Sequence, residues 1–97
     1  RAQKVNPMNV EAYANLGLAL AKAGRTEEAA LRLSQAIEIQ PQFAQSYYYL
    51  GLVRNAQDRL PEAIENYRET LERRPNHPGA RQKLNLLLKE TEKGQPH

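Results

Sequence analysis

The sequence contains no cysteine among its 97 residues. Without a thiol, the chain cannot build a disulfide framework, a thiolate metal site or a cysteine nucleophile. The two histidines offer no substitute, because His77 stands in a predicted turn and His97 ends the chain, too isolated for a metal site or an acid–base pair. A glycine-rich phosphate loop, a nucleophile elbow and an HExxH motif are also absent. We therefore expect no enzyme activity, no cofactor and no metal.

Long apolar runs are missing as well. No run approaches the roughly 20 residues that a helix needs to cross a bilayer, so we expect no membrane insertion. Charge is nearly balanced, with 14 Lys and Arg against 11 Asp and Glu and a net charge of +3. That excess is too weak to predict a nucleic-acid partner by itself.

What the chain does contain is a long internal repeat. Much of segment 13–41 returns at 47–75, and every matching pair is separated by 34 positions. The pairs are Tyr13 and Tyr47, Leu16 and Leu50, Gly17 and Gly51, Leu18 and Leu52, Arg25 and Arg59, Glu28 and Glu62, Ala29 and Ala63, Glu38 and Glu72, and Pro41 and Pro75. A fixed period of this length indicates stacked repeats, each of which buries its apolar face on its neighbour.

Each repeat is predicted to contain two helices. Apolar residues follow helical spacing from Asn9, a favourable N-cap, until Gly24, a favourable helix end. Thr26 is predicted to cap the second helix. Pro41 should end it, because proline clashes with the preceding turn and disfavours helical geometry in the residue before it.

The second unit follows the same plan. Asp58 takes the place of the turn glycine, since aspartate also tolerates unusual backbone angles. Pro61 stands in the first turn of the following helix, where proline is tolerated, and Pro75 ends that helix. Pro78 opens a last helix that carries Asn85 where the repeats carry glycine. We interpret this helix as a polar-faced cap that solvates the end of the stack.

The repeated pattern resembles the tetratricopeptide repeat family. It appears here as AYANLGLALAKAGRTEEAALRLSQAIEIQP and SYYYLGLVRNAQDRLPEAIENYRETLERRP. The resemblance implies an all-α fold, a right-handed α-solenoid of antiparallel helix pairs. It also implies that the first helix of each pair lines a concave surface that usually binds an extended peptide or another protein.

The period also divides the chain. Because Pro7 falls 34 positions before Pro41, we interpret the first residues as the end of an earlier repeat, and the chain as a piece of a longer protein. The predicted units are the tail of that truncated repeat (1–8), repeat 1 (9–42), repeat 2 (43–76), a capping helix (77–93) and a tail (94–97).

First-helix residues outside the packing stripe are the candidates for a peptide-binding groove. They are Ala14, Asn15, Leu18, Tyr48, Tyr49, Leu52, Asn55, Lys83 and Leu86. Tyr48 and Tyr49 are the sharpest of these, because tyrosine gives a large contact area at little entropic cost. The alternative is that one of the two packs back over a neighbouring helix.

Some members of the family grip a C-terminal carboxylate with basic and asparagine side chains on their first helices. In this sequence the places of that clamp fall on Ala14, Leu18, Tyr49, Gly79 and Lys83. Of these only Lys83 could serve, so we expect an apolar or aromatic peptide instead.

Three functions remain open. The first is a scaffold that binds a protein or peptide in the concave groove. The second is self-association into a homo-oligomer through an exposed repeat end around Val10, Tyr13 and Gly17. The third, which we favour least, is an RNA-reading module with a basic rim of Arg54, Lys83 and Lys89 beside stackable tyrosines.

Overall fold

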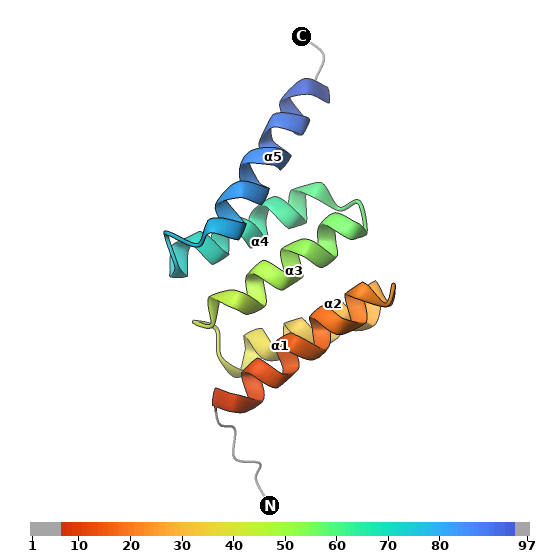
Figure 1. The fold of residues 1–97 in the computed structure, drawn as a ribbon, viewed down its shortest axis with the longest axis vertical. Helices are drawn as coiled ribbons and strands as arrows, with labels where there is room; N and C mark the ends of the chain where they lie inside the picture. The colour runs from red at the N-terminus through yellow and green to blue at the C-terminus, as the bar shows by residue number, and fades with distance from the viewer. Residues whose placement is uncertain (1–6, 95–97) are drawn as a thin grey trace, which may run out of the picture.

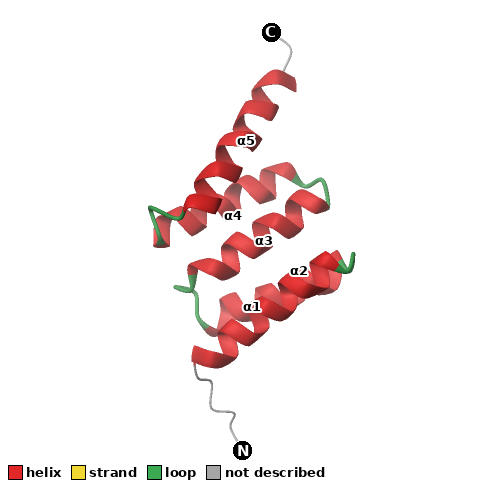
Figure 2. Cartoon of the chain, viewed as in Figure 1, coloured by secondary structure: helices red, strands yellow, loops and turns green. Residues whose placement is uncertain are grey.

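Five helices make up the part of the chain that the structure, a computed structural model, describes, which is residues 7–94. They are α1 (Pro7–Lys22), α2 (Thr26–Ile39), α3 (Ala44–Ala56), α4 (Leu60–Arg73) and α5 (Pro78–Gly94). Between residues 7 and 94 there are only helices and turns, with no strand (Figure 2). The all-α prediction is therefore confirmed. Residues 1–6 of the predicted preceding repeat lie outside the described part.

The helices stack as antiparallel pairs along one long axis. α1 pairs with α2 and α3 with α4, while α5 closes the far end of the stack (Figure 1). The neighbouring pairs meet where α2 contacts α3 and where α4 contacts α5. The first helices α1 and α3 also contact each other, and with α5 they lie toward the viewer in Figure 1. The result is an elongated body of 58 × 28 × 17 Å, and the predicted solenoid is confirmed.

Two glycines let the helices of each pair approach closely. A methyl group added at Gly17 would come within 2.6 Å of Leu33 Cγ on α2. At Gly51 the same group would come within 2.4 Å of the Tyr67 ring on α4. Only a residue without a side chain fits at either place, which explains why glycine recurs at this period.

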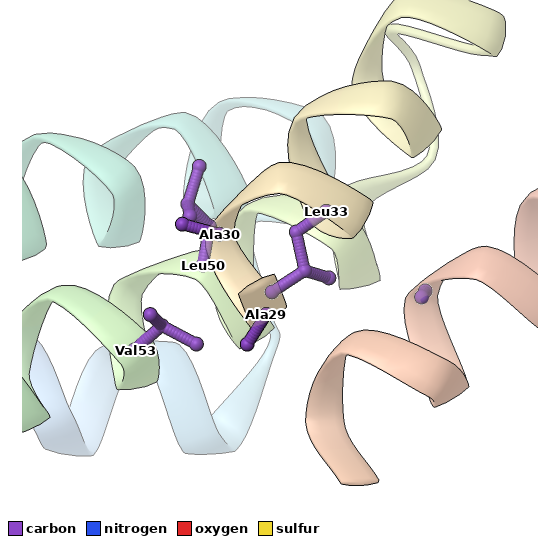
Figure 3. Close-up of a cluster of buried hydrophobic side chains, with 6 residues drawn as sticks. Ala29, Ala30, Leu33, Leu50 and Val53 are labelled. Carbon is purple, nitrogen blue, oxygen red and sulfur yellow. The ribbon is translucent and has the colours of Figure 1, made fainter. Parts of the chain in front are cut away.

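A buried apolar cluster joins the first repeat to the second. The cluster consists of Ala14 from α1, of Ala29, Ala30 and Leu33 from α2, and of Leu50 and Val53 from α3. Figure 3 shows the labelled α2 and α3 side chains gathered between their helices. A second cluster, with Ala63, Tyr67 and Leu87, joins α4 to α5.

The turns inside both repeats have the same backbone form. Gly24 has φ +87° and Asp58 has φ +63°, so the predicted exchange of glycine for aspartate is confirmed. The N–H of the residue after each donates back to a helix carbonyl, Arg25 to Leu20 at 2.9 Å and Arg59 to Arg54 at 2.8 Å. This left-handed turn pairs backbone groups that a helix end otherwise leaves unpaired.

Two predicted helix starts were wrong. Thr26 lies inside α2; the N-cap is Arg25, which makes no capping side-chain hydrogen bond and instead forms an exposed ion pair with Glu28 at 3.2 Å. α1 begins at Pro7 rather than at Asn9, because proline has the backbone angle of a first helical residue and needs no amide partner there. Pro61 does lie in the first turn of α4, as predicted.

Two further properties bear on function. No helix between residues 7 and 94 is long and apolar enough to span a membrane. Within the same described part, no three His, Cys, Asp or Glu side chains come together to hold a metal ion.

Candidate functional site

The consecutive tyrosines of α3 have different environments. Tyr48 packs beneath the start of α5, with its ring centre 4.6 Å from that of His77 and 6.0 Å from that of Tyr67. Its hydroxyl occupies the space next to Gly79, where an added methyl group would come within 2.6 Å. Burial, and secondly the neighbouring Tyr49, raise the pKa of Tyr48. Tyr48 thus helps to hold α5 in place.

The ring of Tyr49 lies beside that of Tyr48, with centres 6.0 Å apart, on the side toward α1. Its half-buried ring packs against the first apolar cluster, and its hydroxyl accepts a hydrogen bond from Gln45 Nε2 at 3.1 Å. The same side chain lines an open pocket. Tyr49 therefore combines a fixed apolar ring with a polar tip at a surface cavity.

The pocket has a volume of about 320 Å³ and lies at the end of the stack face where the first helices begin. Its lining comes from α1, from α3 and from the turns that precede α3 and α5. The lining residues are Glu11, Ala14, Asn15, Phe43, Gln45, Tyr49 and Arg74. Most of these side chains are polar, so the pocket offers hydrogen-bond donors and acceptors.

The structure gathers only some of the predicted groove residues at this pocket. Ala14, Asn15 and Tyr49 line it, although Ala14 is only 1% exposed because it packs in the first apolar cluster. The other predicted residues are not among its lining; Leu18, Leu52, Asn55 and Lys83 are half-buried and Leu86 is exposed. Whether these residues contact a ligand stays a prediction.

Two lining residues, Phe43 and Arg74, do not lie on the first-helix surfaces from which the sequence candidates came. Both lie beside helix ends, Phe43 as the N-cap of α3 and Arg74 as the C-cap of α4. Helical spacing identifies residues on helix surfaces and gives no signal for residues at helix ends. The 34-residue period could have identified Phe43, because it places Phe43 and His77 at the same repeat position, directly before α3 and α5.

His77 proves to be far from isolated. It is 7% exposed and precedes α5, where its Nδ1 accepts a hydrogen bond from the backbone N–H of Ala80 at 3.1 Å. On its other side, Nε2 lies 3.0 Å from Oε1 of Gln45. Burial, and secondly the positive charge of Arg74, lower the pKa of His77 despite an opposing backbone hydrogen bond. The ring is therefore neutral near pH 7 and acts as the cap of α5.

The neighbouring Arg73 and Arg74 at the end of α4 also have different environments, like the two tyrosines of α3. Arg73 is fully engaged: it pairs with Glu69 at 2.7 Å, donates to the Pro41 carbonyl at 2.7 Å and stacks on Tyr47 at 4.2 Å. The exposed Arg74 side chain makes no hydrogen bond or ion pair with any residue of the described part. One arginine holds the repeats together, and the other is a free cation at the pocket.

The open end of the stack also differs from expectation. Val10 is 1% exposed, Gly17 is covered by Leu33, and Tyr13 is half-buried. Val10 and Gly17 therefore cannot form an exposed end, and that part of the prediction was wrong. Among residues 10–22 of α1, the exposed apolar side chains are instead Ala12, Leu16 at 45% and Ala19. Positions three and four residues apart share one side of a helix, so these three form a single face.

Together these features define a helical-repeat protein with a polar pocket at one end of its first-helix surface. Comparison with known sequences agrees: the model of the tetratricopeptide repeat family matches residues 1–42 and 22–80. The chain therefore belongs to the tetratricopeptide repeat family. Its repeats form a protein–protein interaction module.

One curated relative and two solved structures illustrate the similarity. The probable biofilm formation methyltransferase WspC of Pseudomonas putida is 36% identical over 69 residues, which is 71% of this chain but only 16% of that protein. The first repeat domain of Spaghetti (RPAP3), solved with the HSP90 peptide SRMEEVD, has a TM-score of 0.81 at 23% identity and shares its fold, covering 89% of this chain and 68% of that one. The MamA protein has a TM-score of 0.78 at 32% identity, covering 82% and 44%.

Proposed function

We propose that this chain binds an extended peptide or protein segment in the concave surface of α1, α3 and α5. The observation that carries the proposal is the pocket between α1 and α3, which has an aromatic ring on one side and polar side chains around it. Tyrosine anchors of this kind can contribute roughly 1 to 4 kcal/mol to binding. The peptide-bound relative of the same fold supports the choice of a peptide as the ligand.

We expect the binding surface to continue from the pocket along α3 and α5. Leu52 is half-buried on α3 and Leu86 is 53% exposed on α5. Exposed apolar side chains beside polar ones are typical of interaction surfaces. We therefore expect a segment that places one polar group in the pocket and apolar side chains further along.

The proposal can be tested with peptides selected from a random display library against the immobilised chain. Asn15→Arg would fill the pocket from an exposed position on α1, and Leu31→Arg is the matched control on α2, where Leu31 is 53% exposed. We expect Asn15→Arg to weaken binding by about tenfold or more, equivalent to about 1.4 kcal/mol. Leu31→Arg should leave the affinity within about twofold, as is usual for a residue outside the contact. Equal losses from both variants would contradict binding in the groove.

A second function, self-association through the open end, is favoured by a specific observation. Ala12, Leu16 and Ala19 are exposed on α1, whereas the residues 34 positions later, Ser46, Leu50 and Val53, are 0%, 6% and 0% exposed. Leu50 and Val53 pack with residues of α2 in the first apolar cluster. We propose that the corresponding face of α1 pairs with another molecule of this chain. Sedimentation over a wide concentration range tests this. The parent chain should associate as its concentration rises, whereas Leu16→Glu should stay monomeric. A parent chain that stays monomeric at every concentration would contradict self-association.

The methyltransferase named among the relatives raises the question of how such repeats relate to a catalytic domain. The similarity to the Pseudomonas protein covers a small share of that protein's length. We propose that these repeats, where they are joined to a catalytic domain, serve to bring that domain to its protein partner.

A further inference from the structure

One side of α1 carries a row of apolar side chains that no described helix covers (Figure 1). Ala12, Leu16 and Ala19 are spaced by four and three residues, the spacing that aligns side chains along one side of a helix. All three are exposed, Leu16 at 45%. The residues at the same repeat positions of α3 are buried, and two of them pack with α2. The row on α1 therefore has the form of a helix contact whose second helix is missing.

Two exposed charges of opposite sign lie beside the ends of this row. Glu11 precedes Ala12, and Lys22 follows Ala19 at the end of α1. Helical spacing places Lys22 on the same flank of α1 as Glu11 and Asn15, which line the pocket. Neither charge forms an ion pair with any residue of segment 7–94. They are about 16 Å apart along the helix, so they cannot pair with each other.

The order of these charges favours an antiparallel partner helix. In a parallel pair of α1 helices, each Glu11 would lie beside the Glu11 of the other molecule, and like charges repel. In an antiparallel pair, Glu11 of each molecule lies opposite Lys22 of the other, and Ala12 lies opposite Ala19. Leu16 is close to the centre of both pairs. The charges and the apolar row therefore specify the same register.

The α5 end of the stack is more polar than the α1 row. The exposed Arg81 and Asn85 stand at the repeat positions of the tyrosines and of the glycines. A head-to-tail contact would have to remove water from the charge and the amide of these side chains, which is unfavourable. The α1 row of a second molecule is apolar and has complementary charges, as in a two-fold dimer in which one surface meets its own copy.

We infer that two molecules of this chain pair through α1 in an antiparallel two-fold dimer centred on Leu16, with a Glu11–Lys22 pair toward each end of the contact. This inference rests on the proposed self-association and assigns its geometry. Because the charged flank of α1 borders the concave surface, the two-fold axis turns both concave surfaces to the same side. The dimer therefore presents two pockets side by side, which suits a partner that carries its binding segment twice.

Charge reversal tests the register. Glu11→Lys and Lys22→Glu each place like charges opposite each other at both ends of the contact. Each should raise the dissociation constant of the dimer about tenfold in sedimentation at low salt. The double variant, and an equal mixture of the two single variants, restore opposite charges and should associate like the parent chain. Glu65→Lys and Arg68→Glu, at exposed positions on α4, are the matched controls and should also associate like the parent. A double variant as weak as the single variants would overturn the register.

Cross-linking tests the register independently, because the chain contains no cysteine. In the antiparallel dimer Ala12 lies opposite Ala19, within reach of a disulfide, whereas the two copies of Ala12 lie roughly 10 Å apart along the helix. With oxidised glutathione, a mixture of Ala12→Cys and Ala19→Cys should give at least about threefold more cross-linked dimer than either variant alone. Leu31→Cys on α2 measures random collision. A yield from Ala12→Cys alone that equals the yield of the mixture would indicate parallel helices and overturn the inference.

The arrangement of the two concave surfaces is tested with a library-selected peptide, made once and as a tandem. A Gly/Ser linker of about 15 residues between the copies spans roughly 20 Å. The tandem should bind the parent chain at least about tenfold more tightly than the single peptide. In the monomeric Leu16→Glu variant the two forms should bind within about twofold of each other. The same small difference in the parent chain would overturn the side-by-side arrangement.

The result can be separated from that for the proposed self-association. A chain that associates, but whose association is unchanged by charge reversal and whose Ala12→Cys variant links to itself, would refute the antiparallel contact and leave self-association intact. A parent chain that stays monomeric at every concentration would refute both.

Discussion

The two repeats place the same residue in opposite environments. Leu16 on α1 and Leu50 on α3 occupy one repeat position, yet Leu16 is 45% exposed and Leu50 is 6% exposed. Leu50 lies between α2 and α3 in the first apolar cluster (Figure 3), whereas no described helix covers the corresponding side of α1 (Figure 1). Repeat position therefore sets the direction of a side chain, and the neighbouring repeat sets its burial.

The same comparison separates structure from recognition. Residues that agree between the repeats, such as Gly17 and Gly51, lie at helix contacts. Residues that differ include Asn15 and Tyr49, 34 positions apart, and these two face each other's helices across one pocket. In a stack, the variable positions of the first helices are free to be chosen for a ligand because the packing does not depend on them.

The largest expected effect is the difference between the two leucines. Leu50→Ala should lower the free energy of unfolding by about 2 to 5 kcal/mol, because it leaves a cavity in a buried cluster. Leu16→Ala, at an exposed position, should cost about 0.5 kcal/mol or less. Urea unfolding followed by circular dichroism measures both. Similar losses would mean that α1 is covered in solution, as it would be in an oligomer.

The next effect concerns the close helix contact in the second repeat. Gly51→Ala would push a methyl group into the rigid Tyr67 ring, which is fully buried and has Tyr48 packed beside it. We expect a loss of about 1 to 3 kcal/mol, although alanine is the better helix former. The exposed Ala56 at the end of the same helix gives the control, because Ala56→Gly should cost less than about 1 kcal/mol, the glycine penalty of a helix interior. A Gly51→Ala variant that is more stable than the parent would contradict the packing described for α3 and α4.

A pH effect is expected at the start of α5 and not at the start of α3, since His77 precedes α5 where Phe43 precedes α3. The pKa of His77 is lowered in the folded chain, so the unfolded chain, with a pKa of about 6.5, binds the proton more tightly. The contribution of His77 is complete above about pH 6.5 and declines as the pH falls toward the folded pKa. Unfolding at about pH 7.5 and pH 5 should show a smaller difference in His77→Asn than in the parent chain. An equal difference would indicate that other groups cause it.

The smallest effect concerns the two turns. Asp58 adopts the positive φ that glycine adopts at position 24, and this backbone region is unfavourable for a residue with a side chain. Asp58→Gly should therefore stabilise the second repeat by up to about 1 kcal/mol. Gly24→Ala should destabilise the first by about 1 kcal/mol, because the cost is conformational and nothing lies within 4 Å of the added methyl group. Thermal melting measures both, and a loss of stability in Asp58→Gly would contradict this view of the turn.

Most of the fold could be predicted from the overlay of the repeats. The glycines, prolines and the Asp58 turn act through local backbone geometry, which is visible in a single sequence. Burial at the ends of the stack could not be predicted, because Leu16 and Leu50 occupy the same position in the repeat and differ only in which helices pack on them. For the same reason Val10 and Gly17 were assigned to the exposed end, whereas the partner helix α2 buries Gly17.

The site was less predictable than the fold. Tyr48 and Tyr49 are adjacent and chemically identical, and their roles diverge because Gly79 on α5 leaves room for Tyr48. Arg74 and Phe43 lie at helix ends and not on the helix surfaces that helical spacing predicts. The role of His77 depends on contacts with α3 that no spacing rule contains.

The most direct test of the account is an NMR map of the chain with a library-selected peptide. The account predicts that the largest shifts fall on α1, α3 and α5, and are strongest around Asn15 and Tyr49 beside the pocket. Shifts confined to α2 and α4, with the amides around the pocket unmoved, would contradict recognition by the concave surface.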